Sequence, residues 1–448
     1  MKKYCACILL LSLGVASAVR AETMAEVMAY TYENSMGIQA ERAALKGIDE
    51  GVPKAKSGYR PTAGMDFSVG KSHNTVTASG APERTINQTP RQASLSVSQP
   101  IFSGLTTYRS VQMAKQQVQA AEEDLNAFQQ NTLLSAATVY MDLIRDYSVL
   151  ELCRHNEAVL QKHLDDINTR FAVGSLTQTD VAQSKARLSG AVARRIEAEG
   201  QVKIARARYR DVVQKEASVL VDTTKILAPL PRTQAEALEI AFKENPSLKA
   251  AQFAWQAYGY NVKAKEGTLL PSVGVNASSG YLRENDSIDK GQYWKVNANL
   301  SVPLYQGGGD YAAIREAKHL ENQYRILVTK THLDVETAVI AAWEEYQSAK
   351  AEIGAIRQQI GASQVALEGV IQEEQVGRRT VLDVLDAELE HLNNQVAYRQ
   401  AHRNEIVAGY ALLAAIGRLT PERLHLNVEV YNPKVYYDSV QNKWFGVN

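Results

Sequence analysis

The sequence predicts a mainly α-helical protein that contains a few β-strands and carries one structural pattern twice. Three observations lead to this prediction. The two halves of the chain resemble each other, prolines are absent from residues 101–228 and 304–420, and four short segments alternate between apolar and polar residues. Because proline breaks the interior of a helix, its absence over such lengths permits very long helices. Alternation with a period of two is typical of strands.

The chain begins with the pattern of a secretory signal. Lys2 and Lys3 precede an apolar run at residues 8–15, and small residues follow as far as Ala21. Such a run is too short to cross a bilayer as a helix, and the small residues form a cleavage site. We therefore expect residues 1–21 to be removed and the mature protein to be exported.

The composition excludes several classes of function. Basic and acidic residues balance at 49 each, which argues against a nucleic-acid partner, because such proteins carry clustered excess Lys and Arg. Of the three cysteines only Cys153 follows the signal, so the mature chain cannot form an internal disulfide. We expect Cys153 to be a small residue on a helix face rather than a reactive thiol.

The two halves match over most of the mature chain. Residues 98–104 (SQPIFSG) correspond to residues 301–307 (SVPLYQG). The spacing between matched residues changes between Pro61 and Pro100 and is constant afterwards, as expected of a variable loop followed by packed helices. We also expect the inter-repeat linker and the tail to pack as a belt around the middle of the molecule. The predicted segments are a signal (1–21), a first repeat (22–215), a linker (216–233), a second repeat (234–420) and a tail (421–448).

The first long helix is predicted over residues 104–172. Its only glycine is Gly104, at the start, and apolar residues follow the 3-4 spacing of a coiled-coil seam. These residues are Val111, Ala114, Val118, Ala121, Leu125 and Phe128. At 1.5 Å per residue such a helix is about 100 Å long. That length fits a tube or a fibre rather than a compact globule.

Four short segments, two in each repeat, are predicted to be strands. They lie around residues 65–69, 95–97, 273–277 and 294–304, and residues 73–91 and 284–291 are predicted to be hairpin loops. Four strands cannot close a membrane barrel, since small barrels need about eight, and an open edge in lipid would leave backbone groups unpaired. Three copies would supply twelve strands.

At this point the sequence resembles the TolC family of outer-membrane channel proteins, over residues 24–420. The resemblance rests on SQPIF at residues 98–102, SVPLY at 301–305 and VGRRTVLDVLD at 376–386. It implies a homotrimer with a 12-stranded barrel in the outer membrane, four strands from each chain, continuous with a coiled-coil tube in the periplasm. It further implies passive export of proteins by type I secretion, or of small toxic compounds by efflux, with a periplasmic adaptor and an inner-membrane ABC or RND-type pump as partners.

The resemblance also implies where the partner surface lies. Turns between long helices are expected near Gly174 and Gly377, since glycine is favoured where a helix ends. In the family the adaptor meets this periplasmic end. Val173, Gly174, Val376 and Gly377 are therefore the expected adaptor contacts.

The same end is expected to hold an electrostatic gate. Asp383 and Asp386 are three residues apart and share one helix face, and in the family carboxylates at these motif positions ring the constriction. Arg379 matches a gating arginine and is expected to pair across to the neighbouring coiled coil, near Thr179 and Asp180. Glu374 departs from the best-known pattern, which has a tyrosine at this position of the latch.

We predict no catalytic, cofactor or metal site. The glycines at residues 307–309 lack the Lys-Ser/Thr of a phosphate-binding loop and are expected to form a strand-to-helix turn. Glu388 and His391 match half of a di-iron pattern with no second copy and are expected on a helix surface. The alternative to a channel is a structural or adhesive coiled-coil surface protein without transport, which explains the helices but not the strands.

Overall fold

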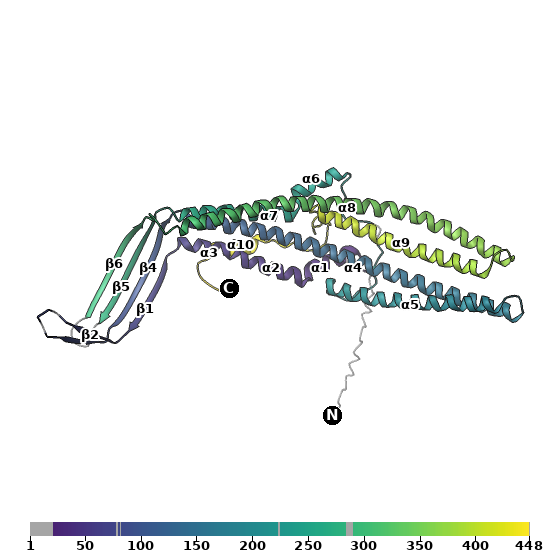
Figure 1. Ribbon diagram of the computed structural model, residues 1–448, viewed down its shortest axis with the longest axis horizontal. Coiled ribbons are helices and arrows are strands. Elements are labelled where there is room, and N and C mark those ends of the chain that lie inside the picture. The colour runs from purple at the N-terminus through teal and green to yellow at the C-terminus, as the bar shows by residue number, and fades with distance from the viewer. Residues whose placement is uncertain (1–20, 78, 81, 223–224, 284–289, 448) are drawn as a thin grey trace, which may run out of the picture.

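The computed structural model describes residues 21–77, 79–80, 82–222, 225–283 and 290–447. The protein is elongated, with a β-sheet at one end and two long helical hairpins running to the other end (Figure 1). The predicted signal lies outside the described residues, except for residue 21. None of the helices in the described part combines the length and the apolarity that crossing a membrane requires.

The elements follow the same order in both repeats, with helices first, then strands, then a long helical hairpin. The first repeat contains α1 (Met24–Asn34), α2 (Met36–Asp49), α3 (Gly51–Lys56), η1 (Ser57–Tyr59), β1 (Thr62–Val69), β2 (Ser72–Val76), β3 (Arg84–Gln88), β4 (Arg91–Ser103), α4 (Thr106–Ala172) and α5 (Gln178–Val213). The second contains α6 (Gln234–Glu244), α7 (Pro246–Gly267), β5 (Ser272–Arg283), β6 (Lys290–Ser301), α8 (Gly309–Gln375) and α9 (Val381–Ala415), and α10 (Lys434–Val440) follows.

The four predicted strands form one antiparallel sheet in the order β1-β4-β5-β6, so β1 and β6 are its edges. Residues directly opposite each other share a face, and the register collects the apolar residues on one face. This face carries Met65, Phe67, Val69, Ala93, Leu95, Val97, Val273, Val275, Ala277, Trp294, Val296, Ala298 and Leu300. Phe67 is 74 % exposed and Trp294 is 80 % exposed, so the apolar face is not covered by the chain itself.

The prediction of a plain loop at residues 73–91 was wrong. The hairpin continues beyond the main sheet as a separate two-stranded ribbon in which β2 pairs with β3, from Ser72 opposite Gln88 to Val76 opposite Arg84. Two polar segments can pair in this way because the ladder uses backbone groups, whatever side chains they carry. The second predicted loop, residues 284–291, lies outside the described residues except for its last two positions.

The long helices set the length of the molecule. Helices α4 and α8 each contain 67 residues, which corresponds to about 100 Å at 1.5 Å per residue. Val111, Ala114, Val118 and Leu125 of the predicted seam are buried, and Ala121 and Phe128 are half-buried. Helix α4 packs against α5, α7 and α9, whereas α8 packs against α6, α7 and α9. The helical hairpins α4–α5 and α8–α9 therefore lie side by side through α4 and α9.

The largest apolar core lies at mid-length, where the short helices of both repeats meet α4, α8 and α9. Its largest side chains are four fully buried tyrosines: Tyr32, Tyr140, Tyr209 and Tyr410. The linker between the repeats packs on this core through Leu220 and Leu227, and the tail packs on it through Leu424. The Tyr140 hydroxyl lies 2.6 Å from the Val221 carbonyl and donates a hydrogen bond to it. This hydrogen bond fixes the linker to α4.

Candidate functional site at the ends of the helical hairpins

The two hairpins end in turns with the same local geometry. Gly174 and Gly377 have φ values of +80° and +74°, in the left-handed region that glycine adopts without strain. In each turn a backbone N–H bonds back five residues, from Ser175 to Arg170 at 3.0 Å and from Arg378 to Glu373 at 2.8 Å. This pattern ends a helix sharply. Both turns lie at the end of the molecule that is farthest from the sheet (Figure 1).

The predicted adaptor contacts are accessible at this tip. Val173 is 77 % exposed and Val376 is 70 % exposed, and nothing among the described residues lies within 4 Å of the position that a Cβ would take on Gly174 or Gly377. Each turn therefore presents an apolar side chain and open backbone to a partner.

Asp180 and Asp383 each complete a capping box at the start of a returning helix. The Asp383 carboxylate accepts hydrogen bonds from the Thr380 backbone N–H and hydroxyl, both at 2.8 Å. Thr177 and Asp180 repeat this arrangement in α5. The bonds from Thr380 and Thr177 lower the pKa of Asp383 and of Asp180. Both carboxylates are therefore ionised helix caps, and the Thr-x-x-Asp spacing is the sequence signal for them.

Asp386 has a different partner from Asp383 within one protomer. It forms an ion pair with Arg187 of α5, so it links the two hairpins. Its side chain is 56 % exposed, which leaves it accessible from solvent. Sequence reasoning missed Arg187, because its partner lies 199 residues away and no local pattern connects them.

Arg379 lies in the turn and pairs within its own hairpin. Its Nε donates to Glu373 Oε2 at 3.0 Å, and Asp383 lies 4.0 Å from its guanidinium. Within the described part of one protomer these are its ion-pair partners, and Thr179 and Asp180 are not among them. The pairing across to the neighbouring coiled coil, near Thr179 and Asp180, stays a prediction.

Glu374, at the position where the family pattern has a tyrosine, forms a second link between the hairpins. Arg170 of α4 donates to Glu374 Oε1 of α8 at 2.9 Å, and the Glu374 side chain is only 13 % exposed. The hydrogen bond from Glu374 raises the pKa of Arg170. The carboxylate of Glu374 thus gives the arginine of α4 a charged partner.

Glu388 forms the third link, and its predicted place on a helix surface was wrong. Its side chain is 7 % exposed, and its Oε1 lies 2.7 Å from His163 Nε2 of α4. The second oxygen, Oε2, is buried without a hydrogen-bond partner among the described residues. The hydrogen bond with Glu388 raises the pKa of His163. Burial follows from packing against α4, which periodicity within α9 does not reveal.

The three links form a seam between the hairpins, which we call the inter-hairpin seam: Arg170–Glu374, His163–Glu388 and Arg187–Asp386. The seam borders an open cavity of about 430 Å³ between α4, α8 and α9, lined among others by His163, Arg170 and Glu374. The hairpins also meet here through a small apolar cluster, which consists of Leu160, Ile167, Ala191, Val381 and Leu385. The polar links therefore lie beside a small packed contact between the hairpins.

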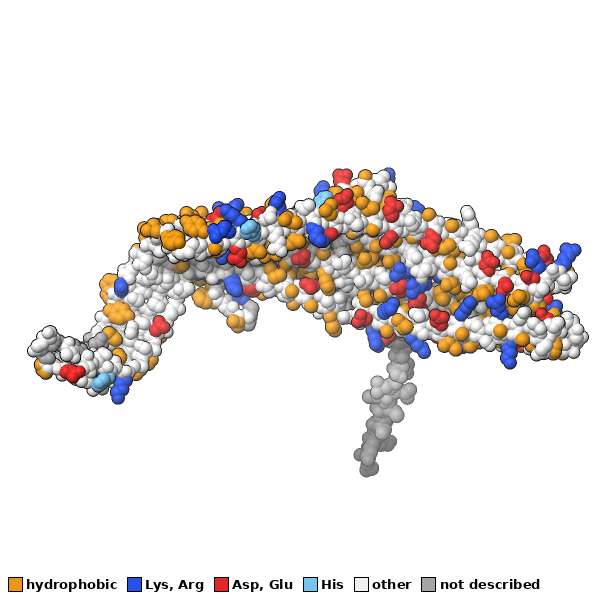
Figure 2. All heavy atoms as spheres, in the orientation of Figure 1, with side chains coloured by type: hydrophobic (Ala, Val, Ile, Leu, Met, Phe, Trp, Pro, Cys, Tyr) orange, Lys and Arg blue, Asp and Glu red, His pale blue; other side chains and the backbone are white. Residues whose placement is uncertain are grey.

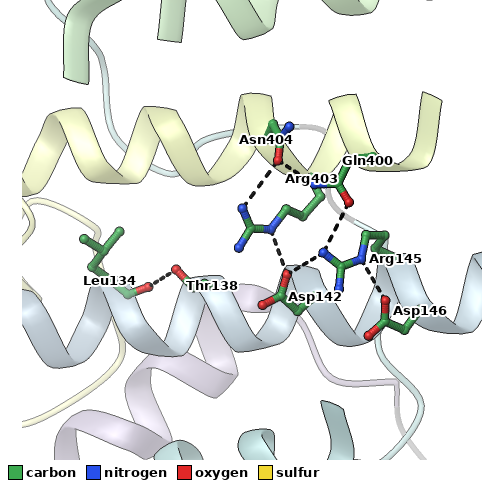
Figure 3. Close-up of polar contacts among 8 residues, drawn as sticks. All are labelled: Leu134, Thr138, Asp142, Arg145, Asp146, Gln400, Arg403 and Asn404. Atoms are coloured by element: carbon green, nitrogen blue, oxygen red, sulfur yellow. Dashed lines mark hydrogen bonds and ion pairs between the residues drawn. The ribbon is translucent and has the colours of Figure 1, made fainter. Parts of the chain in front are cut away.

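Nearer the middle, α4 and α9 are joined by a denser polar network (Figure 3). Arg403 of α9 donates to Asp142 Oδ1 at 2.8 Å, and Arg145 lies 3.0 Å from the same oxygen. Arg145 also bonds to Asp146 at 2.7 Å and to Gln400 at 3.3 Å. Since these groups share partners, this region is more firmly fixed than the inter-hairpin seam.

The remaining sequence motifs have structural roles. Gly307 and Gly308 have φ values of +65° and +83° and lead from the sheet into α8, as expected of a strand-to-helix turn. Cys153 is buried on α4 among apolar residues of α5, and burial raises the pKa of its thiol. In the described ranges no group of three or more His, Cys, Asp or Glu residues could hold a metal ion.

Comparisons with known proteins agree with this architecture. The family model described as outer membrane efflux protein matches residues 31–212 and 237–418, one match in each repeat. The outer membrane efflux protein BepC of Brucella suis biovar 1 (strain 1330) is 35 % identical over 96 % of this chain and 93 % of its own length. Outer membrane protein TolC of Escherichia coli (strain K12) is 24 % identical over 95 % of this chain and 88 % of its own.

Two further comparisons concern secretion and fold. The alkaline protease secretion protein AprF of Pseudomonas aeruginosa is 25 % identical over 66 % of this chain and 63 % of its own length. The crystal structure of the Campylobacter jejuni CmeC outer membrane channel superposes with a TM-score of 0.78, covering 93 % of this chain and 89 % of that one at 13 % identity. The second likeness concerns the fold alone.

Proposed function

Because the chain belongs to the outer membrane efflux protein family and is an outer-membrane export channel rather than an enzyme, we propose that three copies build the duct and that the hairpin ends form its gated periplasmic mouth. Passage through such a duct is passive. The energy comes from an inner-membrane pump, which a periplasmic adaptor couples to the channel.

The single observation that carries this proposal is the sheet. One of its faces is apolar and uncovered, and β1 and β6 are edge strands. In lipid each unsatisfied backbone group at an unpaired edge costs on the order of 2–7 kcal/mol. Pairing of β1 in one copy with β6 in the next removes both edges, and three copies close a wall of twelve strands. A structural or adhesive coiled-coil protein has no need of such a sheet.

The accessible hairpin ends support the position of the mouth. Exposed Val173 and Val376, beside Gly174 and Gly377, offer the adaptor an apolar contact at the tip farthest from the sheet. Asp383 and Asp386 would recur in each copy around the opening and favour cations there. Arg379, released from Glu373, would reach Thr179 and Asp180 of the next copy and hold the mouth closed.

For the cargo we propose small toxic compounds, with secreted proteins as the second candidate. The efflux protein BepC matches nearly the whole chain, whereas the protease secretion protein AprF matches about two thirds of it. Because a passive duct supplies no energy of its own, the choice of cargo belongs to the pump.

Two measurements test the proposal. The mass of the purified mature protein in detergent should be that of a trimer, and a monomer in lipid without a shared wall would overturn the duct. Crosslinking in cells followed by affinity capture should recover an adaptor and an inner-membrane pump. An RND-type partner supports efflux of small compounds, and an ABC partner dedicated to a secreted protein contradicts that choice of cargo.

A further inference from the structure

The end of the tail returns to the base of the sheet. Helix α10 packs beside α2, and its Tyr437 packs against the apolar cluster of Val52, Ala114 and Val118. The chain then runs to the point where β1 begins (Figure 1). We call residues 441–447 the terminal segment. Neither the export function nor the contacts at the hairpin ends involves this segment.

Two side chains just before β1 hold the terminal segment. Arg60 Nη1 donates to the Lys443 carbonyl at 2.8 Å, and its guanidinium carbon lies 4.8 Å from the centre of the Trp444 ring. Lys56 Nζ donates to Asn442 Oδ1 at 2.7 Å. Since β1 begins at Thr62, the segment is fixed at the level where the sheet joins the helices.

The held segment nevertheless exposes its apolar side chains. Trp444 is 58 % exposed and Phe445 is 86 % exposed, with ring centroids 6.4 Å apart. A fixed, exposed pair of large aromatic rings marks a contact surface rather than a random surface residue. Tryptophan is enriched at membrane–water interfaces, where one part of the ring meets acyl chains and the N–H meets water.

Other exposed aromatic residues lie near this pair, around the base of the sheet. Four further aromatic residues at this level are substantially exposed: Tyr59 (50 %), Phe102 (41 %), Tyr108 (46 %) and Tyr305 (76 %). Tyr59 is tied to the sheet, because its carbonyl accepts a hydrogen bond from Gln99 at 2.9 Å. Figure 2 shows that charged side chains are spread over the helical part of the molecule and are sparse on the sheet.

A cluster of cations lies beside the aromatic pair. Lys56, Arg60 and Lys115 are close enough for their charges to interact, and burial together with Lys115 and Arg60 lowers the pKa of Lys56. In the described part of the chain none of the three forms an ion pair with a carboxylate. Three cations without an internal counterion attract anionic groups from outside the protein.

We propose that the terminal segment is an interfacial anchor, in which Trp444 and Phe445 enter the lipid leaflet around the base of the sheet while Lys56, Arg60 and Lys115 bind anionic phospholipid headgroups. This inference rests on the sheet being the membrane-embedded part of the channel. Lipid would contact the apolar face of the sheet as far as Phe102. The terminal segment lies at the same level and would therefore contact the same leaflet. The anchor would fix the height of the channel in the membrane.

Site-selective tryptophan quenching tests the anchor in the full-length trimer reconstituted into vesicles. The chain has Trp255, Trp294, Trp343 and Trp444, so replacing three of them with Phe isolates each one. Phospholipids brominated near the headgroup end of the acyl chain should quench Trp444 at least as strongly as Trp294 on the apolar face. Trp343, in the middle of the helical part, should be unaffected.

Other outcomes are decisive. Quenching of Trp444 by aqueous acrylamide but not by brominated lipid would overturn the anchor and leave the segment in water. Resistance to both quenchers would also overturn it, because the ring would then be buried against a neighbouring copy. If brominated lipid also failed to quench Trp294, the sheet would not lie in the membrane and the proposed function would be wrong. Trp294 therefore distinguishes failure of the anchor alone from failure of the proposed function.

A second variant tests the headgroup preference without removing the aromatic pair. In the protein that keeps only Trp444, brominated phosphatidylglycerol should quench more than brominated phosphatidylcholine. Lys115→Gln, at the cation of this cluster that does not hold the terminal segment, should lower this ratio towards one. Lys203→Gln, at an exposed cation on a long helix, is the matched control and should leave the ratio unchanged. An unchanged ratio in the first variant would contradict the cationic part of the anchor.

Discussion

At the scale of single residues, the most unusual group is the Glu388 carboxyl. Its side chain is almost fully buried, one of its oxygens has no partner among the described residues, and its neighbour is a histidine. A histidine changes charge near neutral pH, and a buried carboxylate is tolerated when its partner is cationic. The state of His163 therefore sets the strength of this link between α4 and α9.

The pKa of His163 is raised by Glu388, and Asp166 and Glu374 add to this. A raised pKa in the folded protein means that the stabilisation is complete below the unfolded value, about 6.5, and is lost as the pH rises through the raised value. We expect the mouth to open more often at pH 8 than at pH 6 in planar bilayers. His163→Gln should flatten this pH dependence, and His155→Gln, an exposed histidine of the same helix, should preserve it. Equal slopes in all three proteins would contradict the role of His163.

The second prediction at this scale concerns selectivity. Asp383→Asn with Asp386→Asn should shift the cation-to-anion permeability ratio of the channel towards one, because carboxylates around a constriction favour cations. Thr380 remains the N-cap of α9, and the amide oxygen of Asp383→Asn can still accept the hydrogen bond from the Thr380 backbone N–H. Reversal potentials in asymmetric salt give the ratio. Glu344→Gln with Glu352→Gln, two exposed carboxylates of α8 far from the turn, should leave it unchanged. An unaltered ratio in the double Asp variant would remove the case for an acidic ring.

At the scale of elements, α4 and α8 have the same length but different surroundings. Helix α4 is enclosed by α5, α7 and α9, whereas α8 lies at an edge of the helical layer in one protomer. Its exposed side chains include Ile326 and Leu333, each 56 % exposed, and Ile340, 37 % exposed. A spacing of seven residues is that of a coiled-coil seam. We expect a helix of the next copy to cover this stripe.

Leu333→Glu should therefore prevent assembly while leaving the protomer folded. A charge buried between helices without a counterion costs on the order of 3–5 kcal/mol. Light scattering in detergent measures the mass, and circular dichroism checks the helices. Ala338→Glu, also exposed but on another side of α8, is the control that should remain trimeric. A normal trimer in the Leu333 variant would exclude the stripe from the interface.

At the scale of the whole molecule, polar contacts are firmest at mid-length and sparse at the mouth. The network around Arg403 and Asp142 shares partners, whereas each link of the inter-hairpin seam is separate. Opening at the hairpin ends alone would break these separate links and the small apolar cluster around Leu160 and Leu385, and it would leave the large core at mid-length intact. This distribution of contacts suits a tube that opens at one end while the rest of the tube stays assembled.

Removing two seam links should favour the open mouth. Partly exposed ion pairs contribute about 0–1 kcal/mol each, so Glu374→Gln with Arg187→Gln should raise the open probability by up to about thirtyfold. Single-channel recording measures this. The matched control is Arg154→Gln with Glu199→Gln, which removes two ion pairs inside one hairpin, Arg154–Glu199 at 3.4 Å and Arg195–Glu199 at 2.9 Å. A gain of the same size in the control would show that general weakening, rather than the seam, controls the mouth.

Local patterns in the sequence determined much of this molecule. The lack of proline and the 3-4 seam predicted α4, alternation predicted the four strands, and glycine marked the turns at Gly174 and Gly377. The three-residue spacing from Thr380 to Asp383 also contains the capping box of α9. All of these features depend on residues within a few positions of each other, because helices and turns form by short-range hydrogen bonds.

The tertiary structure alone decided which distant residues meet. Arg170 and Glu374 are 204 residues apart, and His163 and Glu388 are 225 apart. Burial of Glu388, the pairing of Asp386 with Arg187 and the return of Trp444 to Arg60 follow from how the hairpins and the tail pack. Periodicity within a helix specifies which face is apolar but not which side chain of another helix lies opposite a polar one. That choice depends on the relative register of elements, which is fixed only when the core packs.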